Sequence, residues 1–340
     1  MAFPDILITG ATGFIGFKLL LGAFDEGYSV RAAVRSQEKG EFLLSHPKIR
    51  ALGVVPDKFS VMEVMDICRD GAYDDAVQGV RYIIHSASPL SSPFLDPQTG
   101  IYEPNVQSVR TMLNSALKEA RSLRRLVITS SVVGNTAYPP GSTPEETTTQ
   151  SRVSDTPGPF VFMGPAYGAG KVAALNSIDR FIKDERPSFA VVKALPSVVL
   201  GRDERALGVD DLWAGTNRFL LDLIVTGKSA PWAMPSGVAD VSDVAKVHLM
   251  ALQEVEGTSF PEDVGVTTAN RFNDAWDVVR KHFPKAVAAG VFRRGDQPTV
   301  AFNWNARQTE VDLSCSFKAY EDMVLDVAGQ YLELSGMEKA

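Results

Sequence analysis

The chain has 340 residues, of which 45% are hydrophobic, so it can bury a sizeable core in one large or two smaller domains. Its formal net charge of −7 argues against general affinity for nucleic acid or an anionic membrane, although it does not exclude a local basic site for phosphate. Two cysteines suggest no disulfide framework, and neither a cationic leader nor a membrane-length apolar run is expected, which favours a soluble, cytoplasmic protein.

The N-terminal stretch predicts a strand, a glycine-rich turn and a helix. Residues 6–9 form an apolar run, glycines follow at positions 10, 13 and 16, and a second apolar strand over 29–35 closes a βαβ unit. In such a unit the glycines permit a sharp turn, close approach to a pyrophosphate, and helix–strand contact, while the helix N-terminus attracts phosphate. The pattern predicts a dinucleotide site, with a purely structural turn as the alternative. The residues expected to contact the cofactor here are Thr9, Gly10, Thr12, Gly13, Phe14, Ile15 and Gly16.

The end of the second strand indicates which dinucleotide is bound. NAD sites usually carry an acidic residue there, whereas NADP sites often carry Arg. This strand ends in Arg35, Lys39 follows, and no Asp or Glu occupies the tip. A planar guanidinium can grip the 2′-phosphate, and the ammonium adds a point charge, so NADP(H) is predicted. The alternative is that both are ordinary solvated cations.

Two further strands should bring ligand-binding residues to the same edge of the sheet. Residues 61–65 read as a third strand, after which Asp66 could accept a hydrogen bond from the adenine amino group, with Ile67 against the ring. The alternative for Asp66 is a helix N-cap, since residues 70–77 look helical.

A fourth strand is expected over 80–84, and small residues follow it. Among them, Ala87 and Ser88 suit backbone passing a ligand at the strand's carboxyl end. His85 is better interpreted as a structural histidine than as a general base.

The middle of the chain predicts two more βα units separated by an irregular excursion. A helix is expected over 105–120, a fifth strand over 126–129, a helix over 166–184 and a sixth strand over 189–195. Residues 138–165 contain several prolines and few periodic positions, which indicates a surface excursion returning to a pocket.

After the sixth strand the regular alternation breaks down. Residues 200–235 are rich in aromatic and aliphatic side chains, 238–252 read as a strand edge and helix, and helices are expected at 273–282 and 320–334. A strand-like segment over 299–302 lies between these helices.

The predicted fold class is therefore α/β, a Rossmann-type doubly wound parallel sheet with a smaller, discontinuous α/β substrate-binding domain. Residues 1–196 plus about 238–256 are assigned to the NADP-binding domain, and about 197–237 with 257–340 to the substrate-binding domain.

Tyr167 and Lys171 are the strongest chemical signal. Four residues apart on a helix, they project from one face. A phenol has a reference pKa near 10, and a neighbouring ammonium lowers that pKa, which lets Tyr protonate a carbonyl oxygen as hydride reaches the carbon. The pair alone is weak evidence. A third member should come from the end of the fifth strand, where Ser131 is the best candidate and Ser130 the second, because a hydroxyl there can stabilise the developing charge.

These motifs together resemble the extended short-chain dehydrogenase/reductases. Finer similarities at residues 30–36, 85–89, 196–201 and 241–248 point to the dihydroflavonol reductase branch, which includes fungal aldehyde and ketone reductases of the methylglyoxal reductase type. The resemblance covers nearly the whole chain. The motifs that carry it are Thr9-Gly10-x-x-Gly13-x-x-Gly16, Asp66-Ile67, Thr129-Ser130-Ser131 and Tyr167-x-x-x-Lys171.

The resemblance implies roles for particular residues. It implies Ser131, Tyr167 and Lys171 as the catalytic triad, with Lys171 also on the cofactor ribose. Arg35 and Lys39 correspond to residues that bind the NADP phosphate. Further cofactor contacts are implied for Tyr167, Thr129, Pro196 and Val199, the last two beside the nicotinamide.

The sequence also departs from the pattern of this branch. Gly170 stands where Ser is usual, Leu175 replaces a frequent acidic residue, and residues 138–166 lack a common Trp. Asn105 corresponds to an Asn that sugar epimerases of the same superfamily carry in this helix, over residues 105–120. Hydride transfer is still expected despite these departures, but they leave the identity of the substrate open.

The resulting prediction is an NADPH-dependent reductase of an aldehyde or ketone that works without a metal, as a monomer or homodimer. Its small-molecule carbonyl substrate is expected to be mid-sized and partly hydrophobic or aromatic, rather than a nucleotide sugar. Its rivals are an epimerase or dehydratase that keeps NAD(H) bound, and a non-catalytic NADP-sensing regulator, which would generally lack Tyr167 and Lys171. The expected substrate pocket is formed by Phe94, Ser131, Phe160, Phe162, Trp213, Phe219 and Trp232.

Overall fold

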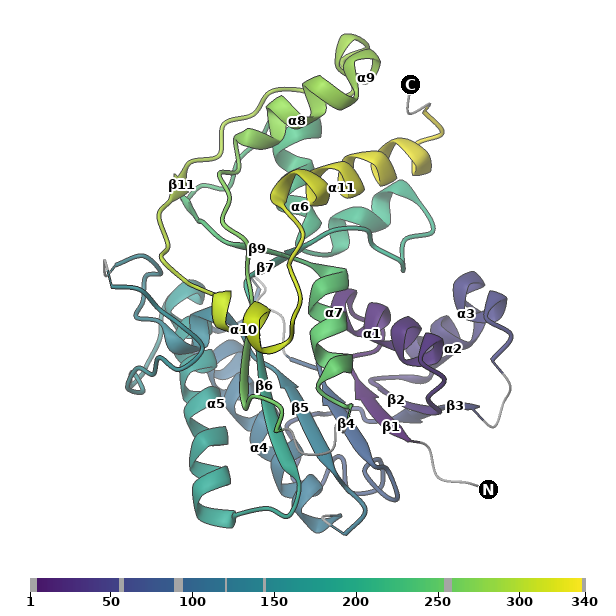
Figure 1. Ribbon diagram of the computed structural model, residues 1–340, viewed down its shortest axis with the longest axis vertical. Coiled ribbons are helices and arrows are strands. Elements are labelled where there is room, and N and C mark those ends of the chain that lie inside the picture. The colour runs from purple at the N-terminus through teal and green to yellow at the C-terminus, as the bar shows by residue number, and fades with distance from the viewer. Residues whose placement is uncertain are drawn as a thin grey trace.

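The computed structural model describes residues 5–54, 58–88, 94–119, 121–142, 145–253 and 259–337. Figure 1 shows a sheet flanked by helices in the lower part and a mainly helical upper part that contains α6, α8, α9 and α11. Pro89, Ala120 and Glu256, which enter the predictions above, lie outside the described residues. Within the described residues, no helix combines the length and apolar character that crossing a bilayer requires.

The main sheet is parallel throughout, with strand order β10-β6-β5-β4-β1-β2-β3. The order reverses between β1 and β4, and open α/β sheets bind ligands at the carboxyl ends of the strands beside such a reversal. The predicted Rossmann-type fold is confirmed. Its strands are β1 (Ile6–Thr9), β2 (Val30–Val34), β3 (Phe59–Glu63), β4 (Tyr82–His85), β5 (Arg125–Thr129), β6 (Ala190–Pro196) and β10 (Asp263–Val266).

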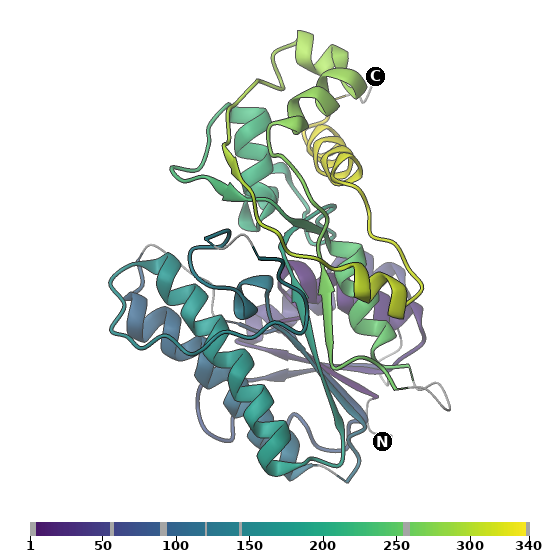
Figure 2. The same cartoon turned by 60° about the vertical axis from the view of Figure 1, so that its left-hand side comes forward.

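Helices cover both faces of this sheet (Figure 2), which explains why its strands are apolar on both sides. Ile6 and Ile8 of β1 belong to the cluster that includes residues of α1 and α7, whereas Leu7 belongs to the cluster formed with α4 and α5. The elements packed around the sheet are α1 (Phe14–Asp25), α2 (Gln37–Ser45), α3 (Pro47–Ala51), α4 (Glu103–Lys118), α5 (Met163–Glu185), α7 (Val241–Met250) and α10 (Arg307–Asp312), with the π-helix Pro97–Tyr102 and the 3-10 helix Val132–Asn135.

The upper part has its own hydrophobic cluster, in which Leu220, Phe272 and Val327 are buried. Its elements are α6 (Asn217–Leu221), α8 (Asp274–His282), α9 (Pro284–Ala288), α11 (Tyr320–Leu334), the 3-10 helix Val209–Ala214, the π-helix Asp222–Thr226, and the strand pairs β7 (Val198–Leu200) with β9 (Val238–Asp240) and β8 (Met234–Pro235) with β11 (Thr299–Val300).

The structure differs from the sequence predictions in two places. Residues 70–77, expected to be helical, form successive turns, because Gly71 adopts a left-handed φ of 72° that interrupts helical geometry. The chain also returns to the main sheet late, since β10 pairs with β6 although 257–340 was assigned to the other domain.

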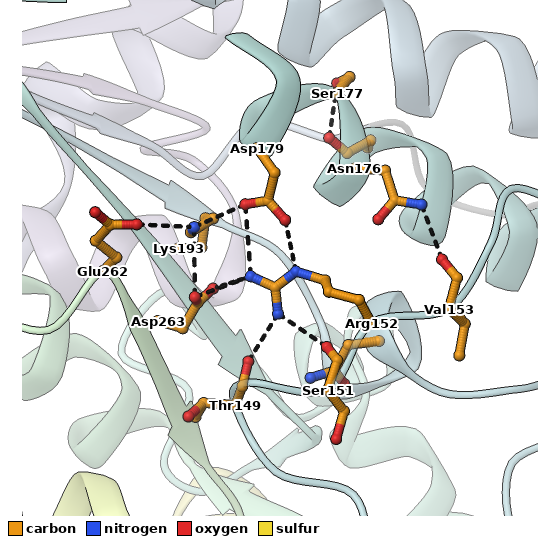
Figure 3. A network of polar contacts seen from close by, with 12 residues as sticks. Thr149, Ser151, Arg152, Val153, Asn176, Ser177, Asp179, Lys193, Glu262 and Asp263 are labelled. Carbon is orange, nitrogen blue, oxygen red and sulfur yellow. Dashed lines mark hydrogen bonds and ion pairs between the residues drawn. The ribbon is translucent and has the colours of Figure 1, made fainter. Parts of the chain in front are cut away.

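A buried ionic network fastens the excursion before α5 to the sheet (Figure 3). The Arg152 guanidinium donates to both carboxylate oxygens of Asp263 at 2.9 Å and to Asp179 of α5 at 2.5 Å. It also donates to the carbonyls of Thr149 and Ser151, at 2.9 and 2.8 Å. Arg152 therefore links the excursion to both α5 and β10, and Asn176 of α5 adds a bond to the Val153 carbonyl at 2.9 Å.

Lys193 of β6 completes this network. Its side chain is only 2% exposed, and its Nζ lies 2.8 Å from Asp179 and 3.4 Å from Asp263. Burial raises the pKa of Asp263, whereas the bonds from Arg152 and Lys193 outweigh burial at Asp179 and lower its pKa. The two cations thus oppose the effect of burial on both carboxylates.

Candidate active site

The glycine-rich turn between β1 and α1 is shaped for close approach. Gly10 has φ of 71°, and a Cβ there would lie 2.8 Å from the Ala87 amide nitrogen. A Cβ at Gly16 would overlap the Gly10 carbonyl oxygen. Helix α1 starts after its N-cap, Gly13, and has no acidic residue in its first turn, so its first amide groups suit an anion. The turn has the features that a pyrophosphate site requires.

Thr9, at the end of β1, uses its side chain within the fold. Its hydroxyl accepts a hydrogen bond from the Ala87 amide at 3.1 Å and lies 2.9 Å from His85 Nδ1. Burial, with a smaller contribution from nearby Lys171, lowers the pKa of His85 to about 3. His85 is therefore neutral and joins β1 to β4, in line with the structural interpretation.

The two cations predicted to recognise a 2′-phosphate lie beyond β2. Arg35 directly follows the strand, and Lys39 is in the first turn of α2. Both are exposed, and neither side chain forms an ion pair or hydrogen bond with the rest of the described chain. Ser36 caps α2 by accepting from the Lys39 amide at 3.4 Å. The backbone is thus ordered around two cationic groups that remain available to a ligand.

Asp66 lies at the same edge, three residues past the end of β3. Its Oδ1 accepts a hydrogen bond from the Cys68 amide at 2.9 Å. A hydrogen bond of this kind would also form if Asp66 capped a helix, but it uses only one of the two carboxylate oxygens. Asp66 is exposed and the neighbouring Ile67 is half-buried, so both side chains are accessible enough to contact an adenine ring.

Ser131, Tyr167 and Lys171 come together at the carboxyl end of β5. Ser131 caps the 3-10 helix Val132–Asn135, accepting from the Val133 amide at 3.4 Å, and its side chain lies close enough to Tyr167 to lower the pKa of the phenol. Lys171 is buried on the next turn of α5, with Nζ 5.6 Å from the centre of the Tyr167 ring. Of the two candidate serines it is therefore Ser131 whose hydroxyl the structure brings to the phenol.

The electrostatics of Tyr167 differ from the sequence expectation. Burial raises the pKa of Tyr167, and the bond from Ser131 only partly offsets it. Lys171 lies over the ring face, and burial lowers the pKa of its own ammonium to about 8. The expectation that Lys171 lowers the phenol pKa is therefore not met in this geometry, because desolvation is the larger effect. The phenol stays protonated at neutral pH, as a proton donor must.

A buried polar chain behind Lys171 was not expected from the sequence. Its Nζ donates to Ser88 Oγ at 2.9 Å, and the Ser88 hydroxyl donates to Asn105 Oδ1 at 3.1 Å. Asn105 is 1% exposed and donates to the Ile101 carbonyl at 2.8 Å. The sequence signals were the correspondence of Asn105 to an Asn of sugar epimerases and the placement of Ser88 after the fourth strand. The structure thus gives Asn105 a definite partner, on which Lys171 depends through Ser88.

Close packing explains the unusual Gly170. A Cβ at this position would lie 3.1 Å from Asn105 Cβ and 3.3 Å from the Tyr102 carbonyl oxygen. Helices α4 and α5 approach so closely here that a serine side chain would require its neighbours to move.

The remaining predicted cofactor residues lie around the ends of β5 and β6. The Thr129 hydroxyl is 2.8 Å from His248 Nε2, and His248 Nδ1 donates to the Val244 carbonyl at 2.7 Å. Burial lowers the pKa of His248 to about 4, so it is neutral and holds Thr129 in place. Pro196 ends β6 and Val199 lies in β7, both buried.

The residues predicted to line a substrate pocket are placed in different surroundings. Phe160 packs on Tyr102 with ring centres 5.0 Å apart, and Phe162, just before α5, is 70% exposed. Trp213 instead packs edge-on against Tyr331 of α11 at 5.7 Å. Of the others, Phe94 and Trp232 are exposed and Phe219 is half-buried. The structure brings Phe160 and Phe162 to the start of α5, whereas Trp213 faces the core of the upper part.

The low pKa of Lys171 predicts an alkaline loss of activity. If the ammonium orders the cofactor, kcat/KM for the cofactor should fall as pH rises through about 8, because Lys171 then loses its proton. A pH profile of kcat/KM measures this. In Lys171→Arg, whose charge persists at higher pH, the residual activity should lose this limb. A limb at the same pH in that variant would assign it to another group.

Comparison with known proteins defines the class. A model of the NAD dependent epimerase/dehydratase family matches residues 6–211. The chain belongs to this family, and its resemblance to the extended short-chain dehydrogenase/reductases is confirmed.

Several individual proteins are similar to this chain over nearly its whole length. The chain is 37% identical over 347 residues to Ketoreductase CTB6 of Cercospora beticola, covering 98% of this chain and 96% of that protein. It is 36% identical, with the same coverage, to Ketoreductase CTB6 of Cercospora nicotianae. Among solved structures, the yeast methylglyoxal/isovaleraldehyde reductase Gre2 complexed with NADPH is 25% identical, with a TM-score of 0.79, and the match covers 98% of this chain and 99% of that one.

Proposed function

We propose that this protein is an NADPH-dependent reductase that converts a ketone or aldehyde to an alcohol. The observation that carries the proposal is that Ser131, Tyr167 and Lys171 meet, with Lys171 over the phenol ring, at the sheet edge that also holds the glycine-rich turn. The names of the relatives, ketoreductases and an aldehyde reductase solved with NADPH, support the same reaction.

The residues present fit the cofactor. The close-packed turn at Gly10 and Gly16 and the open amide groups of α1 suit the pyrophosphate. Arg35 and Lys39 are assigned to the 2′-phosphate, because they are the exposed cations at the end of β2. The remaining proposed contacts are Asp66 and Ile67 to adenine, Lys171 to ribose, and Ala87, Ser88, Thr129, Tyr167, Pro196 and Val199 along the strand ends.

The proposed chemistry divides two tasks between cofactor and protein. Bound NADPH supplies hydride to the carbonyl carbon. Tyr167 donates its phenolic proton to the carbonyl oxygen, and its raised pKa keeps that proton present at neutral pH. Ser131 donates a hydrogen bond to the same oxygen and stabilises the charge that develops there. Lys171, whose ammonium is hydrogen-bonded to Ser88 and lies over the phenol ring, is assigned to ordering the cofactor ribose.

The upper part of the molecule is proposed to bind the substrate. A hydrophobic cluster separate from those of the sheet supports a domain built from about 197–237 and 257–340, excluding β10 and α10, which belong with the main sheet. Exposed aromatic side chains at Phe162 and Trp232 favour a partly apolar substrate over a nucleotide sugar. A cytoplasmic location and a monomeric or homodimeric state are proposed from composition alone.

A panel of carbonyl compounds assayed with NADPH and NADH tests this function. Turnover of ketones or aldehydes with NADPH is expected, measured by nicotinamide absorbance. No turnover with any of them, together with conversion of a sugar nucleotide without net oxidation, would instead identify an epimerase.

Arg35→Asp should shift cofactor preference from NADPH towards NADH. Hydrogen bonds to charged groups contribute about 1.5–3 kcal/mol each, which corresponds to roughly 10- to 150-fold in kcat/KM. The new carboxylate repels the 2′-phosphate and can accept from a ribose hydroxyl, while Lys39 preserves some NADPH binding. The measurement is kcat/KM for both cofactors.

Arg50→Asp is the matched control, since it makes the same charge change at an exposed position of α3. It should leave the NADPH/NADH ratio unchanged. An equal shift in both variants would show that only net charge matters, and an unchanged ratio in Arg35→Asp would remove Arg35 from the cofactor site.

A further inference from the structure

A short segment after β7, residues 203–205, connects the upper part of the molecule to the glycine-rich turn. No role was predicted for these residues from the sequence. In the structure Asp203 is 2% exposed, and Arg205 has a side-chain exposure of 17%. Charged groups so buried require partners, and those partners lie on both halves of the molecule.

Arg205 contacts the turn directly. Its Nη1 donates to the Thr12 carbonyl oxygen at 3.3 Å, and its guanidinium lies over the Phe14 ring, 5.7 Å from the ring centre. Thr12 and Phe14 flank Gly13, the N-cap of α1. Arg205 therefore contacts both sides of the residue at which the proposed pyrophosphate site begins.

The orientation of this guanidinium is set by Asp203. Nε and Nη2 donate to the two oxygens of that carboxylate at 2.9 and 2.6 Å, a bidentate arrangement that fixes the plane of the group. The Asp203 backbone is in turn held by Gln330 of α11, through bonds of 2.8 and 2.7 Å in both directions. The upper part thus provides a rigid base for Arg205.

Neighbouring contacts attach the same segment to the cofactor-binding half. Glu204 pairs with Lys18 of α1 at 3.3 Å and with Lys48 of α3. His46 Nε2 lies 3.3 Å from the Arg205 carbonyl oxygen. These contacts and the bond to Thr12 span α1, α3 and the turn between β1 and α1.

We propose that Arg205 is a cofactor-positioning residue, held by Asp203, that keeps the glycine-rich turn ordered for the pyrophosphate and slows cofactor release. The proposal rests on the proposed function, because it assumes that the turn binds NADPH. Release of the cofactor requires the turn to relax, and the contact to Thr12 must break when it does.

Direct binding of NADPH, followed by the change in its fluorescence, tests the proposal. Arg205→Ala should raise the Kd for NADPH roughly tenfold, the effect of losing one charge-assisted hydrogen bond. The change should appear in the dissociation rate and in KM for NADPH, with kcat at saturating NADPH within about threefold of wild type. Arg205→Lys, which keeps the charge but cannot form the bidentate pair, should recover part of the affinity.

Arg202→Ala is the matched control. Arg202 lies three residues away and pairs with Glu333 of α11 at 2.5 Å, so it shares the segment without contacting the turn. Its loss should leave the Kd unchanged. An equal rise in Kd for Arg202→Ala, or an unchanged Kd in a folded Arg205→Ala, would overturn the proposal. A wild-type protein that binds no NADPH would overturn the proposed function itself, and this proposal with it.

Discussion

Tyr167→Phe should lower kcat for carbonyl reduction by roughly 10²- to 10⁴-fold, the usual contribution of a positioned acid–base group. The substitution removes only the phenolic oxygen. That oxygen lies near Ser131, and the ring that remains still packs beneath Lys171. The loss should therefore fall on the chemical step, while the Kd for NADPH stays within a few-fold of wild type. Steady-state kinetics and direct NADPH binding measure the two quantities separately.

Tyr138→Phe is a suitable control, because it makes the same change on a phenol that packs against α5. The Tyr138 ring lies beside Gly164 and Gly168, where a Cβ on Gly168 would come within 3.0 Å of it. We expect kcat to change little. If both variants lost activity equally, the effect would reflect packing on α5, and near-wild-type turnover in Tyr167→Phe would exclude the assigned proton donor.

Lys193→Met should lower the free energy of unfolding by about 3–5 kcal/mol, the range for removing one partner of a buried ionic group. Met replaces most of the aliphatic volume, so the loss is mainly electrostatic. Lys193 has a side-chain exposure of 2%, and without it Asp179 and Asp263 share the single charge of Arg152. Denaturant unfolding of wild type and variant measures the difference.

The pH dependence of this stability loss distinguishes an electrostatic cause from a packing cause. Burial already holds the pKa of Asp263 above its usual value, and removal of Lys193 should raise it further. Ionised Asp263 therefore costs stability at neutral pH, and this cost is lost as pH falls through its raised pKa. The deficit of Lys193→Met should shrink accordingly on acidification. A deficit that is constant with pH would point to packing instead.

Glu262→Gln is the control for this variant. Glu262 belongs to the same network, 3.7 Å from Lys193 Nζ, but its side chain is 69% exposed. Solvent screens such a pair, so its loss should cost at most about 1 kcal/mol. A larger loss in Glu262→Gln than in Lys193→Met would contradict the view that burial determines the cost.

Local sequence determined the cofactor-binding half of the fold. The apolar run before Gly10 and the glycine spacing predict a strand and turn because only certain backbones satisfy them, and β1 and α1 form as expected. The spacing of Tyr167 and Lys171 places them on one helix face whatever surrounds them. Such patterns depend on neighbours in the chain, so they can be read without the fold. The helix predicted over residues 70–77 was wrong, because the left-handed conformation of Gly71 interrupts helical geometry.

Contacts between distant segments were decided only by the tertiary structure. The sequence left Ser130 and Ser131 as alternatives, and the path of the chain after β5 brings Ser131 to Tyr167. Burial, rather than the neighbouring ammonium, sets the pKa of Tyr167, and burial depends on every element packed around α5. Arg205 reaches Thr12 across 193 positions of the chain. No local pattern encodes such a contact, because it exists only once the two halves have packed together.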